Sequence, residues 1–486
     1  MKKTNGVAAA VAAVALFASS AVGQTPSACS TVLVPTYSPP SVAPGWTAQL
    51  AVAGLTTPRS LLWDGAGGLL VVERTKGITR HTFTDYGGTC LIPDKTTLLV
   101  NNTRLNHGLA LSADGKTLYA STVEAVFAWE YNERAGTVSD TPRTVVNNMT
   151  NNDIVTRTLL VSKKQPGMLL VSRGSSADEN IVKAETVTNG LSQIRAFDLT
   201  RLTATSDPYD FSSSGDILGW GLRNSVGVGE HPVTGGIYAV ENSIDGVTRN
   251  KQDIHETNPG EELNYLGFLN GTTKFPGPNF GYPRCFAVWN ATEIPQNDGL
   301  NIGDQFAIDE DTLTDEVCAA NFTAPRLTMP AHWAPLDIKF NADGSAAYIS
   351  FHGSFDSTNP VGYRLSSVAF NPTTGDPVAA PDSAHDALTD ILTNPASSVC
   401  PGACFRPAGL AFDNQGRIWM TSDSTGEIYV LEKSTSTPTS SASGTIVTTT
   451  GTPSSGAAGS GMLASWGQRV MGLTVAGVVG GVLAFY

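Results

Sequence analysis

The sequence predicts an all-β protein folded as a six-bladed β-propeller. The main observation is a pattern that occurs six times, in which an apolar run, a turn rich in Asp, Gly or Asn, and a second β-rich run follow one another. Each copy has the form of a β-hairpin that cannot bury its apolar face alone, so the copies must pack on one another, and radial packing of small sheets makes a propeller. The copies span residues 61–74, 109–122, 159–175, 226–243, 338–354 and 410–424.

The spacing and composition agree with a large, exported β-protein. The widest gap between copies runs from residue 243 to residue 338, so long loops must extend from the blades there, and such loops often carry function. Charged residues make up 15% of the 486 residues, and the formal net charge is −13. An acidic protein repels polyanions, which argues against nucleic acid or acidic membrane surfaces as partners.

The two ends of the chain differ from its body. Residues 1–23 join a lysine pair, an apolar stretch and a run of small residues, which predicts a cleaved signal peptide. The propeller domain is expected over residues 24–433. Residues 434–461 are almost wholly Ser, Thr, Gly, Pro and Ala, and this composition predicts a linker because it cannot bury enough apolar surface to fold.

Residues 462–486 form a hydrophobic C-terminal segment with an apolar tail over residues 470–486. Small residues, a short spacer and a terminal apolar tail in this order resemble the attachment signal for a GPI lipid anchor. The competing interpretation is a single membrane helix, for which the tail is shorter than the ~20 residues usually needed. The sequence therefore predicts a secreted protein anchored at the outer cell surface through a C-terminal lipid.

Six cysteines in an exported chain favour disulfides over metal or redox chemistry. The spacing is compatible with the pairs Cys29–Cys90, Cys285–Cys318 and Cys400–Cys404 but does not fix the pairing. Five sequons mark candidate glycosylated loops, at Asn101, Asn148, Asn270, Asn290 and Asn321.

Cationic side chains recur at the ends of the copies. The innermost strand of each blade lines the central channel, so residues at one end of these strands converge on a single mouth. Guanidiniums that converge repel one another unless an anion lies among them, and their forked donors match carboxylates. The alternative is that each arginine pairs with an acidic neighbour between blades. The recurring arginines are Arg74, Arg157, Arg173, Arg223 and Arg406.

Two histidines share these places. We call the position of a residue within its copy its phase. His107 stands at the start of the second copy, at the phase assigned to Arg157 and Arg223 in theirs. His352 stands at the end of the fifth copy, at the phase of Arg74 in the first. A histidine beside an anionic ligand is suited to take a proton from a hydroxyl, although a histidine bound to a turn is the common alternative. The remaining histidines, His231, His255, His332 and His385, fall outside the recurring phase and are interpreted as structural.

Acidic turns follow the fourth copy, at residues 241–245 and 258–264. Oxygen-rich turns of this kind suit a hard ion such as calcium, although many are simply solvated. The chain contains no P-loop, no GxSxG and no HExxH, so nucleotide cofactors and the commoner hydrolases find no support.

Several segments follow one another in a characteristic order, among them GLRNSVGV, NPGEELNYL, FHGSFDSTNPVGYRL and RPAGLAFDNQGRIWMTSDSTGEIYVL. Together they resemble the soluble glucose and sorbosone dehydrogenases that use pyrroloquinoline quinone (PQQ), and in particular the fungal pyranose dehydrogenases. The common order of the segments is far more specific than any one of them. The match covers nearly the whole body, from about Trp46 to Glu432.

The resemblance implies that the channel mouth holds PQQ and calcium. His107 then corresponds to the catalytic base, and Arg223 with Asn224 to the pair that holds the quinone. The turn at Ser243 and Ile244 is similar to the one whose backbone oxygens hold calcium, but it departs from the Gly-Pro of the bacterial glucose enzymes. The further quinone contacts would be Arg74, Arg157, His352 and Arg406.

The resulting expectation is an extracellular oxidoreductase that converts the anomeric hydroxyl of a pyranose to a lactone. His107 would remove the hydroxyl proton, and the three carboxylates of PQQ would account for several arginines and a calcium ion. The electrons would pass to a separate haem protein, such as a cytochrome, or to a quinone. The alternatives are a six-bladed propeller lactonase or other hydrolase, and a non-catalytic interaction propeller on the cell surface.

Overall fold

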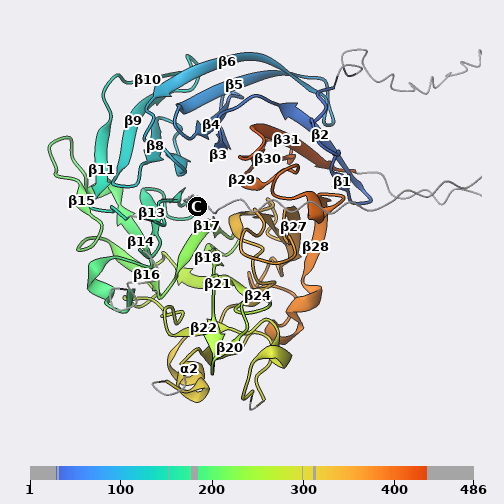
Figure 1. The fold of residues 1–486 in the computed structure, drawn as a ribbon. Helices are drawn as coiled ribbons and strands as arrows, with labels where there is room; N and C mark the ends of the chain where they lie inside the picture. The colour runs from blue at the N-terminus through green and yellow to red at the C-terminus, as the bar shows by residue number, and fades with distance from the viewer. Residues whose placement is uncertain are drawn as a thin grey trace, which may run out of the picture.

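The computed structural model describes residue 29 and residues 32–151, 153–176, 184–297, 299–309 and 313–434. Six mainly antiparallel sheets stand around a central axis (Figure 1). The predicted six-bladed β-propeller is therefore confirmed.

Each blade is a sheet whose strands follow one another from the channel outward. Blade 1 has β3 (Pro58–Trp63), β4 (Leu69–Glu73), β5 (Gly77–Asp85) and β6 (Leu91–Asn101). Blade 2 has β7 (Leu109–Leu111), β8 (Thr117–Ser121), β9 (Val126–Asn132), β11 (Arg143–Asn147) and β15 (Tyr209–Asp210), with β10 (Thr137–Val138) on β9. Blade 3 has β12 (Leu159–Val161), β13 (Met168–Arg173), β14 (Gln193–Asp198) and β16 (Asp216–Trp220).

The second half of the ring continues in the same way. Blade 4 has β17 (Asn224–Glu230), β18 (Gly236–Asn242), β21 (Glu261–Phe268) and β24 (Leu327–Met329). Blade 5 has β25 (Pro335–Phe340), β26 (Ala346–Phe351), β27 (Arg364–Ala369), β28 (Leu388–Thr393) and β1 (Ser41–Val42). Blade 6 has β29 (Pro407–Phe412), β30 (Ile418–Ser422), β31 (Glu427–Lys433) and β2 (Trp46–Val52). Short 3-10 helices lie at Val187–Asn189, Leu199–Arg201, Ala291–Glu293, Pro381–Asp386 and Ser397–Val399.

Each of the six sequence copies forms the two innermost strands of one blade. The innermost strands contact their neighbours in a closed ring, in the order β3, β7, β12, β17, β25 and β29, and β29 contacts β3 again. This ring places the starts of the inner strands, and the ends of the second strands, at one end of the channel, which we term the mouth.

The ring is closed by strands from both ends of the described chain. Strand β2 pairs antiparallel with β31, with Trp46 opposite Lys433, and so completes blade 6. An N-terminal strand thereby joins a sheet otherwise built from the last three strands.

The second strands are apolar because both of their faces are covered by neighbouring blades. In β4 the residues Leu69, Leu70, Val71 and Val72 have no exposed area. Leu69 and Val71 pack with Trp419 of blade 6, whereas Leu70 and Val72 pack with Leu118 and Trp129 of blade 2, among others. Such strands show a continuous apolar run rather than alternation.

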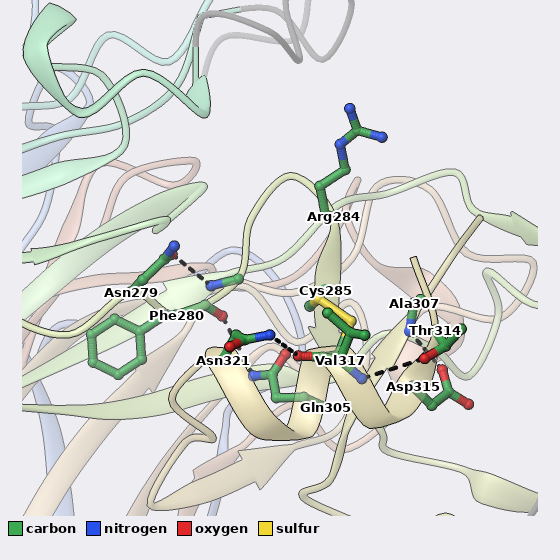
Figure 2. Close-up of a disulfide and its surroundings, with 12 residues drawn as sticks. Asn279, Phe280, Arg284, Cys285, Gln305, Ala307, Thr314, Asp315, Val317 and Asn321 are labelled. Atoms are coloured by element: carbon green, nitrogen blue, oxygen red, sulfur yellow. Dashed lines mark hydrogen bonds between the residues drawn. A yellow bond between two sulfur atoms is a disulfide. The ribbon is translucent and has the colours of Figure 1, made fainter. Parts of the chain in front are cut away.

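A long insertion between β21 and β24 lies beyond blade 4, at the foot of the view in Figure 1. It contains β22 (Cys285–Ala287), β23 (Gln305–Ala307) and helix α2 (Asp315–Asn321), while β19 (Thr248–Arg249) and β20 (Gln252–Asp253) precede β21. The helix is linked to β22 by the disulfide Cys285–Cys318 (Figure 2). The other disulfides are Cys29–Cys90 and Cys400–Cys404, so all three suggested pairs are present.

The predicted signal peptide at residues 1–23 and the C-terminal hydrophobic segment at residues 462–486 lie outside the described residues, as does the predicted linker beyond Ser434. Across the described ranges, no helix has the length and apolar character needed to cross a membrane. Four sequon asparagines, Asn101, Asn148, Asn270 and Asn321, are exposed, and Asn290 is half-buried.

Candidate active site

The backbone register shows which residues occupy equivalent places at the mouth. Three N–H groups that follow a second strand each donate to a carbonyl just before the inner strand of the same blade. The pairs are Arg74 to Thr57 at 3.2 Å, His352 to Ala334 at 2.9 Å, and Asp423 to Arg406 at 3.3 Å. Arg74 and His352 are therefore equivalent, as the sequence predicted, and Asp423 is the third member of the set.

A second equivalent set lies in the inner strands or within two residues before them. In each blade the turn between the two innermost strands is closed by a main-chain hydrogen bond, such as Asp64 N–H to the Gly68 carbonyl in blade 1. The equivalent residue lies five positions before the residue that donates this bond. The six residues found in this way are Arg59, His107, Arg157, Val226, Leu336 and Ala408. Val226, Leu336 and Ala408 pack together as a small apolar cluster. The channel is thus apolar along three blades and basic along the other three. Arg223 lies three residues before Val226, so it does not share the phase of His107 that the sequence suggested.

Asp423 joins two of the mouth residues. Its carboxylate accepts from Arg59 Nη1 at 2.5 Å and from His352 Nε2 at 2.8 Å, and all three side chains are buried. Burial opposes ionisation of Asp423, but the charge and hydrogen bonds of His352 and Arg59 hold its pKa well below the ordinary value. Burial also lowers the pKa of His352 to about 4, although Asp423 opposes this shift.

His107 is 2% exposed and lies beside Arg59, whose Nε–H donates to His107 Nδ1 at 3.3 Å. Burial lowers the pKa of His107 well below its ordinary value, and the charges of Arg59, Lys339 and Arg74 lower it further. The imidazole is therefore neutral at neutral pH. Because Nδ1 accepts from Arg59, the ring proton is assigned to Nε2 in this arrangement.

Arg74 is a cation whose side chain has no hydrogen-bond acceptor in the described part of the chain. Its side chain is half-buried, and that side chain makes no hydrogen bond or ion pair with any described residue. Burial lowers its pKa and the charge of Arg59 lowers it further, while Asp423 opposes the shift. A cation held beside another cation with no carboxylate of its own fits an anionic ligand.

Arg406 also lacks an acidic partner among the described residues. Its Nε and Nη2 donate to the carbonyl oxygens of His352 and Gly353, at 3.1 and 2.9 Å, and its guanidinium lies over the ring of Tyr363 at 5.6 Å. These contacts fix the guanidinium and leave its charge unneutralised.

Arg157 was predicted to contact the cofactor, and in the structure main-chain oxygens hold its guanidinium. It is fully buried, and its guanidinium donates to the carbonyl oxygens of Met149, Ile154 and Thr156 at 2.6 to 2.9 Å. Burial lowers its pKa to about 9, with a contribution from the charge of Arg173. Its described hydrogen bonds all go to the loop before β12, so Arg157 supports the backbone of this loop.

Arg223 and Asn224 line a small polar cavity of about 20 Å³, together with Ser243, Asp245 and Glu261 among others. Arg223 Nη1 donates to the Ser243 carbonyl at 2.5 Å, and Nη2 pairs with Asp245 at 2.8 Å. The Asn224 side chain makes no hydrogen bond with the described residues. A cavity of this size holds one water molecule or one ion.

Glu261 lines this cavity, and two further buried glutamates, Glu241 and Glu262, both accept hydrogen bonds from the Asn264 amide. Burial raises the pKa of Glu261 to about 8 and that of Glu262 to about 7. Burial raises the pKa of Glu241 well above its ordinary value, and the nearby Glu262 and Glu261 raise it further. Glu261 accepts from the Ser243 N–H at 2.8 Å. This surrounding is rich in oxygen atoms, and a hard divalent cation bound there would favour the ionised form of the carboxyl groups.

The two predicted calcium ligands, Ser243 and Ile244, already have other contacts in the structure. The Ser243 carbonyl already accepts from Arg223, and the Ile244 side chain packs into the apolar cluster of the insertion. In the described part of the chain, no three His, Cys, Asp or Glu side chains form a group that could hold a metal by themselves.

Three residues at the mouth were not predicted. Arg59 shares the phase of His107, and Asp423 shares that of Arg74, so aligning the copies by their turns would have found both. His332, which was interpreted as structural, lines the small cavity, and its Nε2 lies 2.6 Å from the His255 carbonyl oxygen that accepts its hydrogen bond. Its phase gave no signal, because it belongs to the loop before β25.

The fold and the mouth define a propeller that is built to hold an anionic ligand beside a neutral histidine. Comparison with known families gives the particular one. The model of the TrAA12-like family matches residues 40–434, and the chain belongs to this family.

Two curated relatives are similar over most of the chain. A protein of Hypocrea jecorina described as a PQQ-dependent sugar dehydrogenase is 52% identical over 402 residues, which are 82% of this chain and 90% of that protein. A PQQ-dependent pyranose dehydrogenase of Coprinopsis cinerea is 34% identical over 408 residues, 81% of this chain but only 54% of that protein.

Solved structures agree with these relatives. The calcium structure of a Trichoderma reesei enzyme of carbohydrate-active family AA12 is 52% identical, with a TM-score of 0.80, and the match covers 83% of this chain and 99% of that one. The holo PQQ domain of the Coprinopsis cinerea pyranose dehydrogenase is 32% identical, with a TM-score of 0.77, over 82% of this chain and 98% of that one.

Proposed function

We propose that the protein oxidises the anomeric hydroxyl of a pyranose to a lactone, with PQQ and calcium bound at the propeller mouth. Its class, a PQQ-dependent sugar dehydrogenase, is that of its family. The observation that carries the proposal is Arg74, a half-buried cation with no partner among the described residues, next to Arg59 and the neutral His107. The family relation favours this function over a lactonase or an interaction propeller.

The residues at the mouth fit an anionic quinone. PQQ carries three carboxylates, and forked guanidiniums bind carboxylates well. Arg74 and Arg406 have no carboxylate partner among the described residues, and the Asn224 amide lines the cavity without a hydrogen bond there. When bound, PQQ supplies an electrophilic quinone that accepts a hydride. The proposed contacts are Arg74, Arg223, Asn224, His352 and Arg406.

His107 is proposed to accept the hydroxyl proton of the sugar. It is neutral at neutral pH, as a base must be. To accept the proton at Nε2, the ring must carry its proton on Nδ1, so the Arg59 Nε–H must turn away from it. That hydrogen bond is long, at 3.3 Å, whereas the ion pair of Arg59 with Asp423 is 2.5 Å and holds the guanidinium independently of His107. Negative charge on a bound cofactor would also raise the pKa of His107 and strengthen it as a base.

Calcium is proposed to bind at the turn of Ser243 and Ile244, through main-chain oxygens, with Glu261 supplying negative charge. The Ser243 carbonyl is occupied by Arg223 in the structure, so calcium binding requires this guanidinium to shift toward Asp245 or toward a cofactor carboxylate. A divalent ion would relieve the repulsion among the buried Glu241, Glu261 and Glu262.

The protein is proposed to work outside the cell. Its three disulfides are typical of oxidising compartments. The electron acceptor is proposed to be a separate cytochrome or a quinone, and attachment to the membrane is proposed to occur through a C-terminal lipid.

The test is reduction of a dye by the purified protein, with a panel of pyranoses and calcium, before and after addition of PQQ. We expect activity only with PQQ, a lactone as product, and a loss of roughly 10² to 10⁴ in kcat for His107→Ala. His385→Ala is the matched control, because His385 is an exposed histidine whose ring packs edge-to-face with Trp289 and is not among the proposed site residues. No PQQ binding and no dye reduction with any pyranose would overturn the proposal.

A further inference from the structure

A cavity of about 440 Å³ lies between blade 3 and the insertion, separate from the small cavity beside Arg223. Its walls come from the end of β16, from residues 279–284, from the end of helix α2 and from Glu185. The lining side chains include Trp220, Asn279, Arg284, Phe322 and Glu185. The volume is in the range of small-molecule sites.

Part of the cavity wall lies at the same end of the propeller as the mouth. The outermost strand of a four-stranded antiparallel blade ends where the next inner strand begins, so Trp220, the last residue of β16, lies at the mouth end. The chain then crosses Gly221 and Leu222 to Arg223. Three residues span at most about 11 Å, so the main chain of Trp220 lies within that distance of the main chain of Arg223, a proposed cofactor contact. A short oligosaccharide can span such a distance.

The chemistry of the walls fits a neutral sugar. Trp220 and Phe322 are half-buried aromatic residues, and flat rings of this kind pack against the apolar C–H face of a pyranose. Among the described residues, the Trp220 indole N–H and the Asn279 Nδ2 group have no hydrogen-bond acceptor. These donors can bind the hydroxyl groups at the edge of the ring.

The charged side chains of the cavity wall give no net charge that would attract an anionic or a cationic ligand. Arg284 Nε is paired with the Glu185 carboxylate, so the two ionised residues of the wall cancel. The pair still offers the remaining donors of Arg284 and the second carboxylate oxygen, a combination that binds hydroxyl groups from both sides. A neutral polyhydroxy compound with an apolar face is therefore the class that matches the site.

The site is held in place by main-chain hydrogen bonds and a disulfide. Trp220 donates to the Pro278 carbonyl at 3.1 Å and accepts from the Phe280 N–H at 2.9 Å, while Thr323 donates to the Asn279 carbonyl at 2.7 Å. The Cys285–Cys318 bridge joins the strand that follows Arg284 to helix α2, whose C-cap is Phe322. In Figure 2 Arg284 extends away from this bridge and from the helix. A preformed site costs less to order on binding.

We propose that this cavity is a second pyranose subsite, which binds the distal sugar of an oligosaccharide while the reducing-end sugar is oxidised at the mouth. The proposal rests on the proposed function for its oxidation step, but the sugar-binding step is independent of PQQ. The substrate class is then neutral oligosaccharides with a free reducing end.

The first experiment compares kcat/KM for a disaccharide and for its monosaccharide in the holoenzyme. Trp220→Ala and Phe322→Ala should each lower the disaccharide-to-monosaccharide ratio by about fivefold or more, mainly through KM, because the lost contact binds substrate and transition state alike. Phe275→Ala is the matched control, since Phe275 is an exposed phenylalanine of the same insertion that does not line the cavity. An unchanged ratio in both variants, with normal monosaccharide oxidation, would overturn the subsite and leave the proposed function standing.

The second experiment measures binding without the redox reaction. Saturation-transfer NMR with methyl maltoside and methyl cellobioside, whose anomeric positions are blocked, is performed on the full chain without PQQ. We expect binding of at least one glycoside to wild type and its loss in Trp220→Ala, even if no sugar is ever oxidised. Absence of binding in wild type would overturn the subsite. Binding that appears only after enzymatic deglycosylation would also overturn it, because the cavity would then hold a glycan of the protein itself, for which Asn321 is the nearest sequon residue.

Discussion

The substitution Arg74→Met should weaken PQQ binding while leaving the cofactor-free protein as stable as before, or slightly more stable. Several buried arginines, such as Arg59, Arg249 and Arg417, pair with a carboxylate, and removing one of them would leave that carboxylate orphaned. Arg74 has no partner to orphan among the described residues, and its charge is repelled by Arg59. Methionine keeps much of the apolar stem that packs at the mouth.

The magnitudes follow from the two different partners. A hydrogen bond to a charged group contributes about 1.5 to 3 kcal/mol, so loss of the proposed contact to a PQQ carboxylate should weaken binding about 10- to 150-fold. Relief of the repulsion from Arg59 is screened by solvent because Arg74 is only half-buried, and we expect a gain of no more than about 0.5 kcal/mol in the cofactor-free protein.

The assay combines isothermal titration calorimetry with PQQ and thermal unfolding without it. Arg201→Met is the matched control, because the Arg201 side chain is 80% exposed and pairs with Asp198 away from the mouth. PQQ affinity within twofold of wild type would refute the argument. So would a clear loss of stability in the cofactor-free variant, since that is the signature of a broken structural pair.

Three further predictions concern the mouth. The acidic limb of the kcat/KM profile should reflect protonation of His107, so activity is lost as pH falls through its pKa. Arg59→Met removes a cation that lowers this pKa, and the limb should therefore move to higher pH; a shift to lower pH would contradict the assignment. Asp423→Asn should lower the free energy of unfolding by about 3 to 5 kcal/mol in denaturant titrations, because Arg59 and His352 lose a buried carboxylate. The folded pKa of Asp423 lies below the unfolded value of about 3.9, so its contribution is present above that pH and is lost as the pH falls below it; the difference between wild type and variant should shrink in acid, and a constant difference would count against the pair. Removal of calcium by a chelator should abolish dye reduction and lower the unfolding temperature. Calcium added back at about 100 times its Kd should raise the free energy of unfolding by about 2.7 kcal/mol. Ser243→Ala should retain calcium, because the proposed ligand is a main-chain oxygen, whereas Glu261→Gln should weaken its binding; equal effects of both variants would exclude the proposed arrangement.

The fold was predictable because each blade repeats the same packing problem. The second strands are sandwiched between blades, so runs such as Leu69 to Val72 are continuously apolar and easy to recognise. The pairing of β2 with β31 was not predicted, because Trp46 and Lys433 are far apart in sequence and their strands carry no pattern that links them.

Site residues that occupy an equivalent position in several copies were predictable from the sequence. Site residues in loops outside the copies were not. Arg74 and His352 occupy equivalent positions, as their places in the copies indicated. For Arg157 the place in the copy indicated the strand position but not the partners, which are three carbonyl oxygens of the loop before β12. The wall of the large cavity, including Arg284 and Phe322, belongs to the insertion, whose shape follows from loop and disulfide contacts rather than from any repeat.

The direction of β31 also fixes the face of the propeller at which the described chain ends. Strand β30 runs toward the mouth, where Asp423 follows it, so the antiparallel β31 runs from Glu427 at the mouth to Lys433 at the opposite end. The chain therefore leaves the propeller on the face away from the proposed active site. A tether that begins there would keep substrate, product and electron acceptor unobstructed, and would present the catalytic face outward from any surface to which the protein is held.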